Sequence, residues 1–244
     1  MDKLVASPAE AVADIADGAS IAVGGFGAAG VPWALVAALY RQGARHLRVV
    51  TNNCGLGGAG LAVLLREGRI DHVTASYIGT NEVFARHYLA GSIELELTPQ
   101  GTLAERLRAG GAGIAAFFTP TGVGTMVAEG GLPLRYGPGG EVLLASPPKE
   151  VRRFRVRDLD RDFVLEEAIV TDYAFVRAAV ADRHGNAVFH TAARNFNPDV
   201  AMAGRTTILE AARVVEVGEL EPDAVHLPGV FVQRIVHVAE GVPA

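Results

Sequence analysis

A glycine-rich loop between a short apolar run and a proline-initiated helix constrains the fold of this chain more than any other feature. Residues 20–25 are apolar and bounded by glycine, which is typical of a strand buried on both faces. Pro32 favours the first turn of a helix, which we expect to continue to about Gln42. Strand, loop and helix in this order form one βα unit, and such units predict a parallel sheet covered by helices.

The βα pattern repeats through the first half of the chain. Ser7, Pro8 and Glu10 form a capping box, which predicts a first helix over about residues 8–16. Further patterns predict strands at residues 47–51, 73–78, 95–97 and 114–118, helices at 60–66 and 103–108, and a helix capped by Asn81. We therefore expect parallel βα repeats to dominate this half.

The second half changes character. Strands without intervening helices are predicted at residues 141–145, 163–168 and 174–181. Turn residues at 182–186 precede an apolar stretch at 187–190, which predicts a hairpin and antiparallel pairing. Residues 138–140 are the most linker-like stretch, but the flanking strands are too short to form two separate cores. We predict an α/β fold with a single open mixed sheet flanked by helices, in one domain over residues 1–244.

Composition and charge exclude several classes of protein. The chain has 244 residues, of which 50% are hydrophobic, so it can bury an extended core. Its 22 Lys and Arg against 27 Asp and Glu leave a net charge of −5 with no long basic run, which disfavours a nucleic-acid binder. Residues 18–40 and 109–128 carry no charge, but several glycines and a proline interrupt each stretch. We interpret both as buried strand, turn and helix pieces rather than membrane spans.

The cysteine and histidine content limits metal and disulfide chemistry. Cys54 is the single cysteine, which excludes an internal disulfide framework and a zinc site built from several thiolates. The seven histidines show no metal-ligand spacing, so we expect no metal site. The N-terminal residues carry no visible targeting signal, and we expect a cytoplasmic location.

The glycine-rich loop is also the strongest candidate for a binding site. It comprises Gly24, Gly25, Phe26, Gly27, Ala28, Ala29 and Gly30. Free backbone N–H groups in the loop, with the positive end of the helix at Val31 and Pro32, favour an anionic group such as a phosphate, an oxyanion or a carboxylate. A purely structural tight turn is the alternative interpretation.

The same residues satisfy the pattern G-x-G-x-x-G, so a nicotinamide-dependent dehydrogenase has to be weighed. That fold places an acidic residue at the end of the second strand to bind the ribose. This chain has Thr51, Asn52 and Asn53 there, with no carboxylate nearby. The pattern therefore gives only weak support for a dehydrogenase.

Over a longer stretch the sequence resembles a known family. The resemblance extends over nearly the whole chain, and the segments that carry it are residues 17–32, Thr51-Asn52-Asn53-Cys54-Gly55, residues 96–106, and Ala193-Arg194-Asn195-Phe196-Asn197-Pro198. They are similar to family I coenzyme A transferases, and the chain looks like the α (A) subunit of the 3-oxoacid type. This resemblance implies a fold shared with ribose-phosphate isomerases and glucosamine-phosphate deaminases.

The resemblance also implies the mechanism and the partner. In this family a glutamate in a Ser-Glu-Asn-Gly motif on the β subunit is the covalent nucleophile, and this chain has no such motif. We therefore expect half of an active site here, with a β (B) subunit for its partner, in an αβ or α2β2 assembly. The implied reaction moves CoA from an acyl-CoA such as succinyl-CoA to a 3-oxoacid, acetoacetate or 3-oxoadipate. It is a ping-pong reaction through a glutamyl-CoA thioester, with CoA thioesters as substrates and no tightly bound cofactor.

The family pattern assigns roles to three polar residues. Gln100, a neutral donor after Pro99, is expected to contact an oxyanion or a substrate carboxylate. Asn52 and Asn53 are expected to line the same CoA or substrate pocket, together with the glycine-rich loop. The alternatives are that Gln100 only ties a loop to the backbone and that the asparagines cap strand ends.

Other candidates are weaker. Cys54 is expected to be a small buried residue rather than a nucleophile. Arg194 and Asn195 match the family motif but could equally form a satisfied polar corner near the partner interface. Glu105 and Arg106 are expected to face solvent or to form a salt bridge.

Two observations leave the function open. Thr80 stands where relatives with acetoacetate activity have glutamate, while residues 27–30 and 113–118 look closer to 3-oxoadipate transferases. The rival functions are an acyl-CoA-binding regulatory subunit without catalysis and a sugar-phosphate isomerase or deaminase on the same fold. An isomerase needs an acid and a base on one chain, and no convincing pair is present.

Overall fold

The computed structural model of the chain describes residues 1–55, 59–79 and 81–239. Its helices are α1 (Pro8–Ala11), α2 (Trp33–Gln42), α3 (Leu61–Arg66), α4 (Glu82–Leu89), α5 (Gln100–Gly111), α6 (Met126–Glu129) and α7 (Asn197–Ala203). Its strands are β1 (Leu4–Val5), β2 (Ser20–Val23), β3 (Leu47–Thr51), β4 (Ile70–Ala75), β5 (Glu94–Leu97), β6 (Ala116–Thr119), β7 (Pro133–Tyr136), β8 (Val142–Ala145), β9 (Val151–Val156), β10 (Leu159–Glu167), β11 (Thr171–Asp182), β12 (Ala187–Val188), β13 (Gly204–Val215) and β14 (Arg234–His237).

A nine-stranded sheet dominates the part of the chain that the structure describes. Its order is β1-β14-β13-β11-β2-β3-β4-β5, with β12 attached to β11. All pairs along this order are parallel, and the β11–β12 pair is antiparallel. The parallel sheet predicted from the βα repeats is therefore confirmed for β2 to β5.

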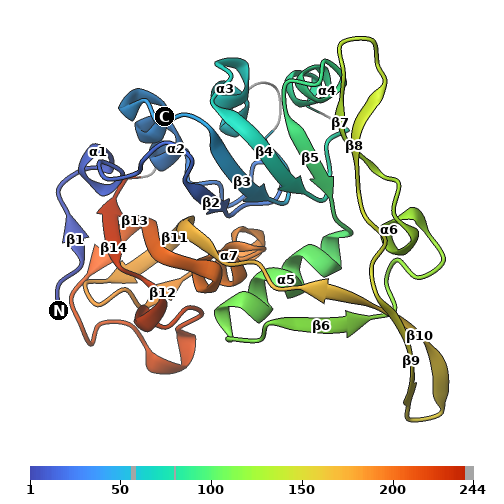
Figure 1. The fold of residues 1–244 in the computed structure, drawn as a ribbon. Helices are drawn as coiled ribbons and strands as arrows, with labels where there is room; N and C mark the ends of the chain where they lie inside the picture. The colour runs from blue at the N-terminus through green and yellow to red at the C-terminus, as the bar shows by residue number, and fades with distance from the viewer. Residues whose placement is uncertain (56–58, 80, 240–244) are drawn as a thin grey trace.

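Helices cover this sheet on two sides (Figure 1). Side chains alternate along β2: Ile21 and Val23 pack into one core cluster with residues of α2, α3 and α4. Ala22, between them, packs into a second cluster with residues of α5 and α7. An apolar run without polar alternation therefore marks a strand that is buried on both faces.

The main sheet is mixed, as predicted, but the prediction of one sheet is wrong, because strands within residues 116–167 form two further small sheets. β6 was expected as another parallel strand, but it pairs antiparallel with β10, which also pairs with β9. β7 and β8 form a separate antiparallel pair. Figure 1 shows these strands along one flank, where the β9–β10 hairpin projects from the molecule. β11, predicted in an antiparallel region, instead lies parallel to β2 and β13 in the centre of the main sheet.

The predictions that rest on a helix-capping residue and on turn residues are confirmed for α4 and for the hairpin after β11. Asn81 accepts a hydrogen bond from the Phe84 N–H and caps α4, as predicted. The hairpin after β11 is confirmed, and its Asp182 carboxylate accepts hydrogen bonds from two turn amides. Residues 138–140 lie in the turn between β7 and β8.

Several element boundaries differ from the prediction: α5 and β11 begin three residues earlier than predicted, β10 begins four residues earlier, and α1 and β4 also differ. α1 ends at Ala11 rather than near residue 16, because the following residues turn to bury Val12 and Ile15. β4 begins three residues earlier than predicted and ends at Ala75. The strand therefore includes two polar residues, Asp71, which is exposed, and His72, which is half-buried.

Candidate functional site

The glycine-rich loop forms a tight turn directly after β2. Phe26 and Ala29 exchange two backbone hydrogen bonds of 3.0 Å each. Gly30 has a φ of 69°, a conformation that L side chains rarely adopt, and a Cβ there would lie 2.6 Å from the Ala193 carbonyl oxygen. Glycine is therefore required at this position by both conformation and space.

Two asparagines hold the loop from behind. Asn195 Nδ2 donates to the Ala29 carbonyl at 3.1 Å, and Asn197 Nδ2 donates to the Gly30 carbonyl at 3.0 Å. Asn197 is fully buried, and its Oδ1 accepts from the Arg177 N–H. The amide of Asn195 is thus hydrogen-bonded within the chain, while its place relative to a partner interface stays a prediction.

The positive end of α2 is occupied by a carboxylate of the same chain, which corrects the expectation of a ligand anion there. Glu210 Oε2 accepts from the N–H groups of Ala34 at 2.9 Å and Leu35 at 3.3 Å. Its Oε1 lies 3.3 Å from Nη1 of Arg177, and Glu210 is 1% exposed. Burial raises the pKa of the Glu210 carboxyl, although Arg177 and the two amides oppose this shift. The loop itself, rather than the helix end, faces the site.

A cavity of about 420 Å³ lies at the carboxyl ends of β2, β3 and β4. The described residues that line it are Phe26, Gly27, Asn52, Asn53, Ser76, Tyr77 and Gln100. Carboxyl ends of parallel strands meet at one edge of a sheet, which is the usual place for a ligand in such folds. Phe26 and Tyr77 are half exposed, at 50% and 51%, and form an aromatic rim.

A chain of hydrogen bonds orders the polar residues of the cavity. Asn52 is buried at its centre, and its Oδ1 accepts from Nε2 of Gln100 and Oγ of Ser76, both at 2.7 Å. Its Nδ2 donates to Oδ1 of Asn53 at 3.1 Å, which also accepts from the Gly27 N–H at 3.2 Å. The arrangement presents neutral donors and acceptors to the cavity.

The cavity brings together part of the predicted site. The predicted residues that line it are Gln100, Asn52, Asn53, Phe26 and Gly27. The other predicted loop residues are not among its described lining and instead shape the turn: Gly24, Gly25, Ala28, Ala29 and Gly30.

Ser76 and Tyr77 were not predicted as site residues. The sequence pattern placed both inside a strand over residues 73–78, whereas β4 ends at Ala75. They follow β4 as Asn52 and Asn53 follow β3, and Ser76 donates its backbone N–H to the Asn52 carbonyl. The parallel register of two neighbouring strand ends is the signal that could have identified them.

Cys54 is 1% exposed, so the interpretation as a buried residue is confirmed. Burial raises the pKa of its thiol, which keeps the sulfur protonated. Thr80 lies outside the described residues.

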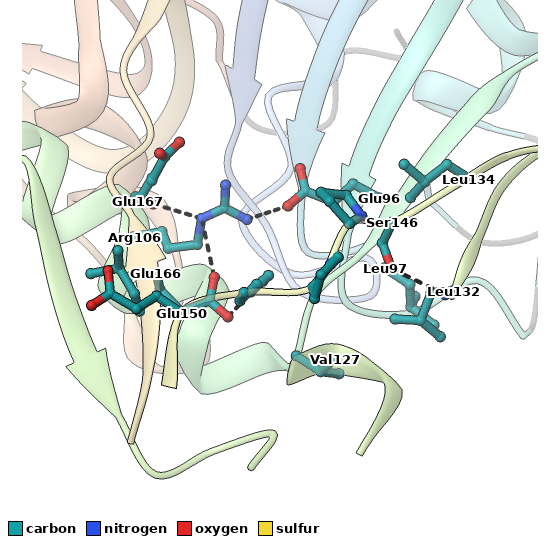
Figure 2. Close-up of a pocket in the computed structure, with 14 residues that line it drawn as sticks. Glu96, Leu97, Arg106, Val127, Leu132, Leu134, Ser146, Glu150, Glu166 and Glu167 are labelled. Carbon is teal, nitrogen blue, oxygen red and sulfur yellow. Dashed lines mark hydrogen bonds and ion pairs between the residues drawn. The ribbon is translucent and has the colours of Figure 1, made fainter. Parts of the chain in front are cut away.

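A second cavity, of about 350 Å³, lies between α5 and the segment over residues 127–167 (Figure 2). Arg106 reaches into it with a side chain that is only 11% exposed and forms an ion pair with Glu96 at 2.5 Å. Of the two predicted alternatives for Arg106, the salt bridge is therefore confirmed. Glu105 pairs with Arg108 at the surface of the same helix.

Metal ligands and membrane spans can be assessed over residues 1–55, 59–79 and 81–239. Within these ranges, no group of three or more His, Cys, Asp and Glu side chains is arranged to hold a metal ion. None of the helices in the same ranges is long and apolar enough to cross a membrane.

Comparisons with known proteins show the family and agree with the fold. The family model described as Coenzyme A transferase matches residues 5–238. The chain is 58% identical over 238 residues to the probable A subunit of the succinyl-CoA:3-ketoacid coenzyme A transferase of Mycobacterium tuberculosis, covering 98% of this chain and 94% of that protein. It is 48% identical to the human "Succinyl-CoA:3-ketoacid coenzyme A transferase 2, mitochondrial", covering 96% of this chain and 44% of the human protein.

Among solved structures, the apoenzyme of the acyl-CoA transferase YdiF from Escherichia coli O157:H7 superimposes with a TM-score of 0.77 at 25% identity. The match covers 97% of this chain and 47% of that one. The chain thus spans less than half the length of the YdiF and human proteins, and nearly the full length of the mycobacterial protein.

Proposed function

The chain belongs to the coenzyme A transferase family, and on this premise we propose that it is the α subunit of a succinyl-CoA:3-ketoacid CoA-transferase. The observation that carries the proposal is the cavity of neutral hydrogen-bond donors around Asn52 and Gln100. The 58% identity to a relative of that name over nearly the full length supports it. Membership of this family also argues against the dehydrogenase alternative.

The proposed reaction is ping-pong. A glutamate carboxylate of the partner attacks the thioester carbonyl of the acyl-CoA, forming a mixed anhydride and releasing CoA thiolate. The thiolate attacks the glutamyl carbonyl, which releases the first acid and leaves a glutamyl-CoA thioester. The acceptor acid then reverses both steps, so that CoA leaves on the acceptor and the glutamate carboxylate is restored.

Each step places negative charge on a carbonyl oxygen, and Gln100 is suited to stabilise it. The hydrogen bond to Asn52 uses one N–H of the Gln100 amide, and the amide has a second N–H to donate. Because Asn52 Oδ1 also accepts from Ser76, the orientation of the Gln100 amide is set before substrate binds. Donors fixed in this way stabilise charge without reorganisation during the reaction.

The role of the chain is then to supply the substrate half of a shared site. The proposed partner is a β subunit with the nucleophilic glutamate in a Ser-Glu-Asn-Gly motif, in an αβ or α2β2 assembly. The proposed acceptor is a 3-oxoacid, acetoacetate or 3-oxoadipate. A single domain over residues 1–244, a cytoplasmic location and the lack of a tightly bound cofactor remain predictions.

A tagged purification from the native host tests the proposal. Associated chains are identified by mass, and the eluate is assayed for CoA transfer from succinyl-CoA to acetoacetate and to 3-oxoadipate. We expect a stoichiometric partner with the Ser-Glu-Asn-Gly motif and transfer to one of the two acids. A lone chain that binds acyl-CoA without transfer would favour the non-catalytic binding role, and robust transfer by the isolated chain would contradict the half-site proposal.

A further inference from the structure

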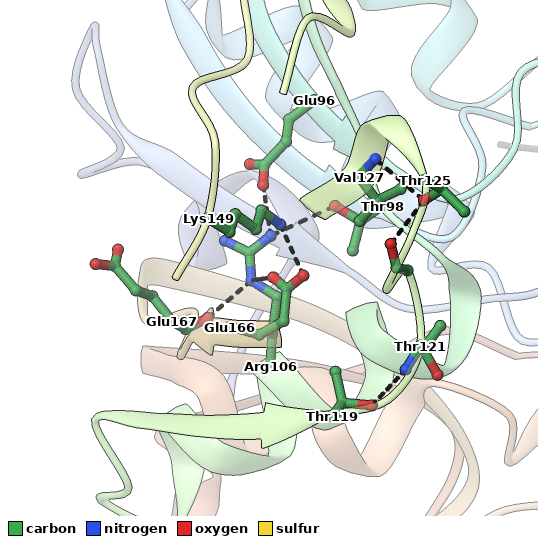
Figure 3. Close-up of polar contacts among 11 residues, drawn as sticks. Glu96, Thr98, Arg106, Thr119, Thr121, Thr125, Val127, Lys149, Glu166 and Glu167 are labelled. Atoms are coloured by element: carbon green, nitrogen blue, oxygen red, sulfur yellow. Dashed lines mark hydrogen bonds and ion pairs between the residues drawn. The ribbon is translucent and has the colours of Figure 1, made fainter. Parts of the chain in front are cut away.

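Arg106, in the middle of α5, connects this helix to two other parts of the fold (Figure 3). Its Nη1 donates to Glu96 Oε1 on β5 at 2.5 Å and lies 3.4 Å from Oγ1 of Thr98. Its Nε donates to the Glu167 carbonyl oxygen at the end of β10 at 2.8 Å. The guanidinium is planar and offers N–H donors in fixed directions, so it can donate hydrogen bonds to β5 and to β10 at the same time.

The same residue is also anchored through its backbone. The Arg106 carbonyl accepts from the Ile169 N–H at 2.9 Å, in the connection between β10 and β11. Glu96 is in turn held by Thr74 on β4, whose Oγ1 donates to Glu96 Oε2 at 3.1 Å. Arg106 is therefore the point where α5, the edge of the main sheet and β10 meet.

The turn that carries Gln100 lies between Thr98, which Arg106 contacts, and Arg106 itself. Thr98 donates its N–H to the Ala75 carbonyl at the end of β4, and the Pro99 carbonyl accepts from the Leu103 N–H in the first turn of α5. Gln100 is the first residue of α5. Any movement of α5 relative to β5 would shift the Gln100 amide relative to Asn52.

We propose that Arg106 is a positioning residue for the transferase reaction, which holds α5 against β5 and β10 so that the Gln100 amide stays aligned with Asn52. This inference rests on the proposed function. Arg106 is not among the described residues that line the cavity containing Gln100, so it acts through Gln100 rather than on substrate.

The charges around Arg106 explain why a neutral residue would not replace it. Glu166 is 1% exposed, pairs with Lys149 at 2.7 Å and lies 3.9 Å from Nε of Arg106. Removing the guanidinium leaves Glu96 without its ion-pair partner, and leaves Glu166 with Lys149 alone. Glu96 is 32% exposed, so water can hydrate its carboxylate once the ion pair is lost, and the turn after β5 then loses its anchor on α5.

The kinetic test compares Arg106→Met with Arg108→Met in the assembled enzyme. Arg108 lies on the same helix but pairs with Glu105 at the surface, so its loss removes the same charge without touching the turn. We expect kcat/KM to fall by about tenfold to a hundredfold for Arg106→Met and by less than about twofold for Arg108→Met. Arg106→Lys should recover part of the loss, because an ammonium can pair with Glu96 but cannot reach both partners.

A double-mutant cycle with Gln100→Ala separates positioning from a general structural role. If Arg106 acts through Gln100, Arg106→Met costs little further activity in the Gln100→Ala background. Full additivity of the two losses would overturn the proposal. A wild-type assembly without transferase activity would instead count against the proposed function, and the following measurement would still decide the role of Arg106.

The spectroscopic test uses the full chain labelled with ¹⁵N in its glutamine side chains. There are three glutamines, Gln42, Gln100 and Gln233, so the side-chain amide spectrum is simple and Gln100→Ala assigns the signals of interest. We expect Arg106→Met to move the Gln100 signals and to leave those of Gln42 and Gln233 in place. Unmoved Gln100 signals, or an equal shift in Arg108→Met, would refute the proposal. If Arg106→Met does not fold, Glu96→Gln weakens the same contact and should move the same signals.

Discussion

Nε2 of Gln100 lies 2.7 Å from Oδ1 of Asn52, although 48 residues separate them in sequence. The contact joins the first residue of α5 to the residue that follows β3. Asn52 also accepts a hydrogen bond from Ser76 and donates one to Asn53. The contact between Gln100 and Asn52 therefore organises the polar wall of the cavity. Changes to either residue should therefore disturb the whole wall.

Replacing Gln100 with alanine should lower turnover while leaving assembly with the partner intact. The loss of one preorganised donor corresponds to about 1–3 kcal/mol of transition-state stabilisation, or about fivefold to 150-fold in kcat. Steady-state kinetics on the assembled enzyme measure the effect, and gel filtration checks assembly. Gln42→Ala serves as control, because Gln42 donates to the Ile15 carbonyl away from the site. Unchanged kinetics for Gln100→Ala would remove Gln100 from the catalytic site.

Asn52→Ala should affect stability as well as activity. Asn52 is 3% exposed, and its replacement removes the acceptor of Gln100 and leaves Ser76 Oγ with only the backbone carbonyl of residue 52, at 3.2 Å. We expect a loss of about 1–3 kcal/mol in the free energy of unfolding, together with lower turnover. Urea unfolding followed by circular dichroism measures the first effect. A free energy of unfolding equal to that of wild type would contradict this prediction, since it would mean that water replaces the hydrogen bonds of the Asn52 amide.

Replacement of Gly24 and of Gly101 by alanine should change the stability of the fold in opposite directions. A Cβ on Gly24 would lie 2.1 Å from Oδ1 of Asn197, which is fully buried behind the loop, so Gly24→Ala should destabilise the fold by several kcal/mol. A Cβ on Gly101 meets no atom within 4 Å and lies inside α5, so Gly101→Ala should stabilise by about 0.5–1 kcal/mol. Thermal unfolding of both variants side by side tests the pair, and equal shifts in the unfolding temperature would contradict the close packing of Gly24 against Asn197.

Replacement of Glu210 by glutamine should make the free energy of unfolding depend less on pH. Burial raises the pKa of Glu210 in the folded state, so the native state holds more protons than the unfolded chain between the usual glutamate pKa and the raised one. The contribution of Glu210 to stability is therefore greatest below the usual pKa and is lost as pH rises through that window. Urea unfolding between about pH 4 and pH 7 should show a smaller decline for Glu210→Gln than for wild type. Glu105→Gln, at the surface, is the control, and identical slopes for Glu210→Gln and wild type would refute the prediction.

Cys54 should be unreactive in the folded chain. The thiol is 1% exposed and its pKa is raised by burial, so little thiolate forms at neutral pH. A colorimetric disulfide reagent should label one equivalent of thiol in urea and almost none in buffer, because Cys54 is the single cysteine. Rapid labelling of the native chain would show that the surroundings of Cys54 open readily.

Much of the fold followed from local patterns. The strand at Leu47–Thr51 and the helix that ends at Gln42 match their predictions, because buried apolar runs, proline and glycine act within a few residues. The strand at Ile70–Ala75 was placed three residues too late, and Ser76 and Tyr77 were missed as a result. Asp71 and His72 belong to this strand, but polar residues that are exposed or half-buried do not predict a strand from the sequence.

The partners of charged residues could not be predicted from the local sequence. The helix end at Val31 and Pro32 was correctly identified as favourable for an anion, but Glu210 comes from a strand 176 residues away from Ala34. Arg106 was expected at the surface or in a salt bridge, and its partners lie on β5 and β10. No local pattern specifies which distant carboxylate or carbonyl will meet a given donor.

The sequence by itself determined the α/β class, the parallel first half, the glycine-rich turn, and the residues Asn52, Asn53 and Gln100 as site candidates. These depend on local propensity and on a motif, which act over a few residues. Tertiary structure alone decided that residues 116–167 leave the main sheet, that Glu210 fills the end of α2, and that Arg106 joins α5 to β5 and β10. These outcomes depend on contacts between residues far apart in sequence, whose energies are set only when the whole core is packed.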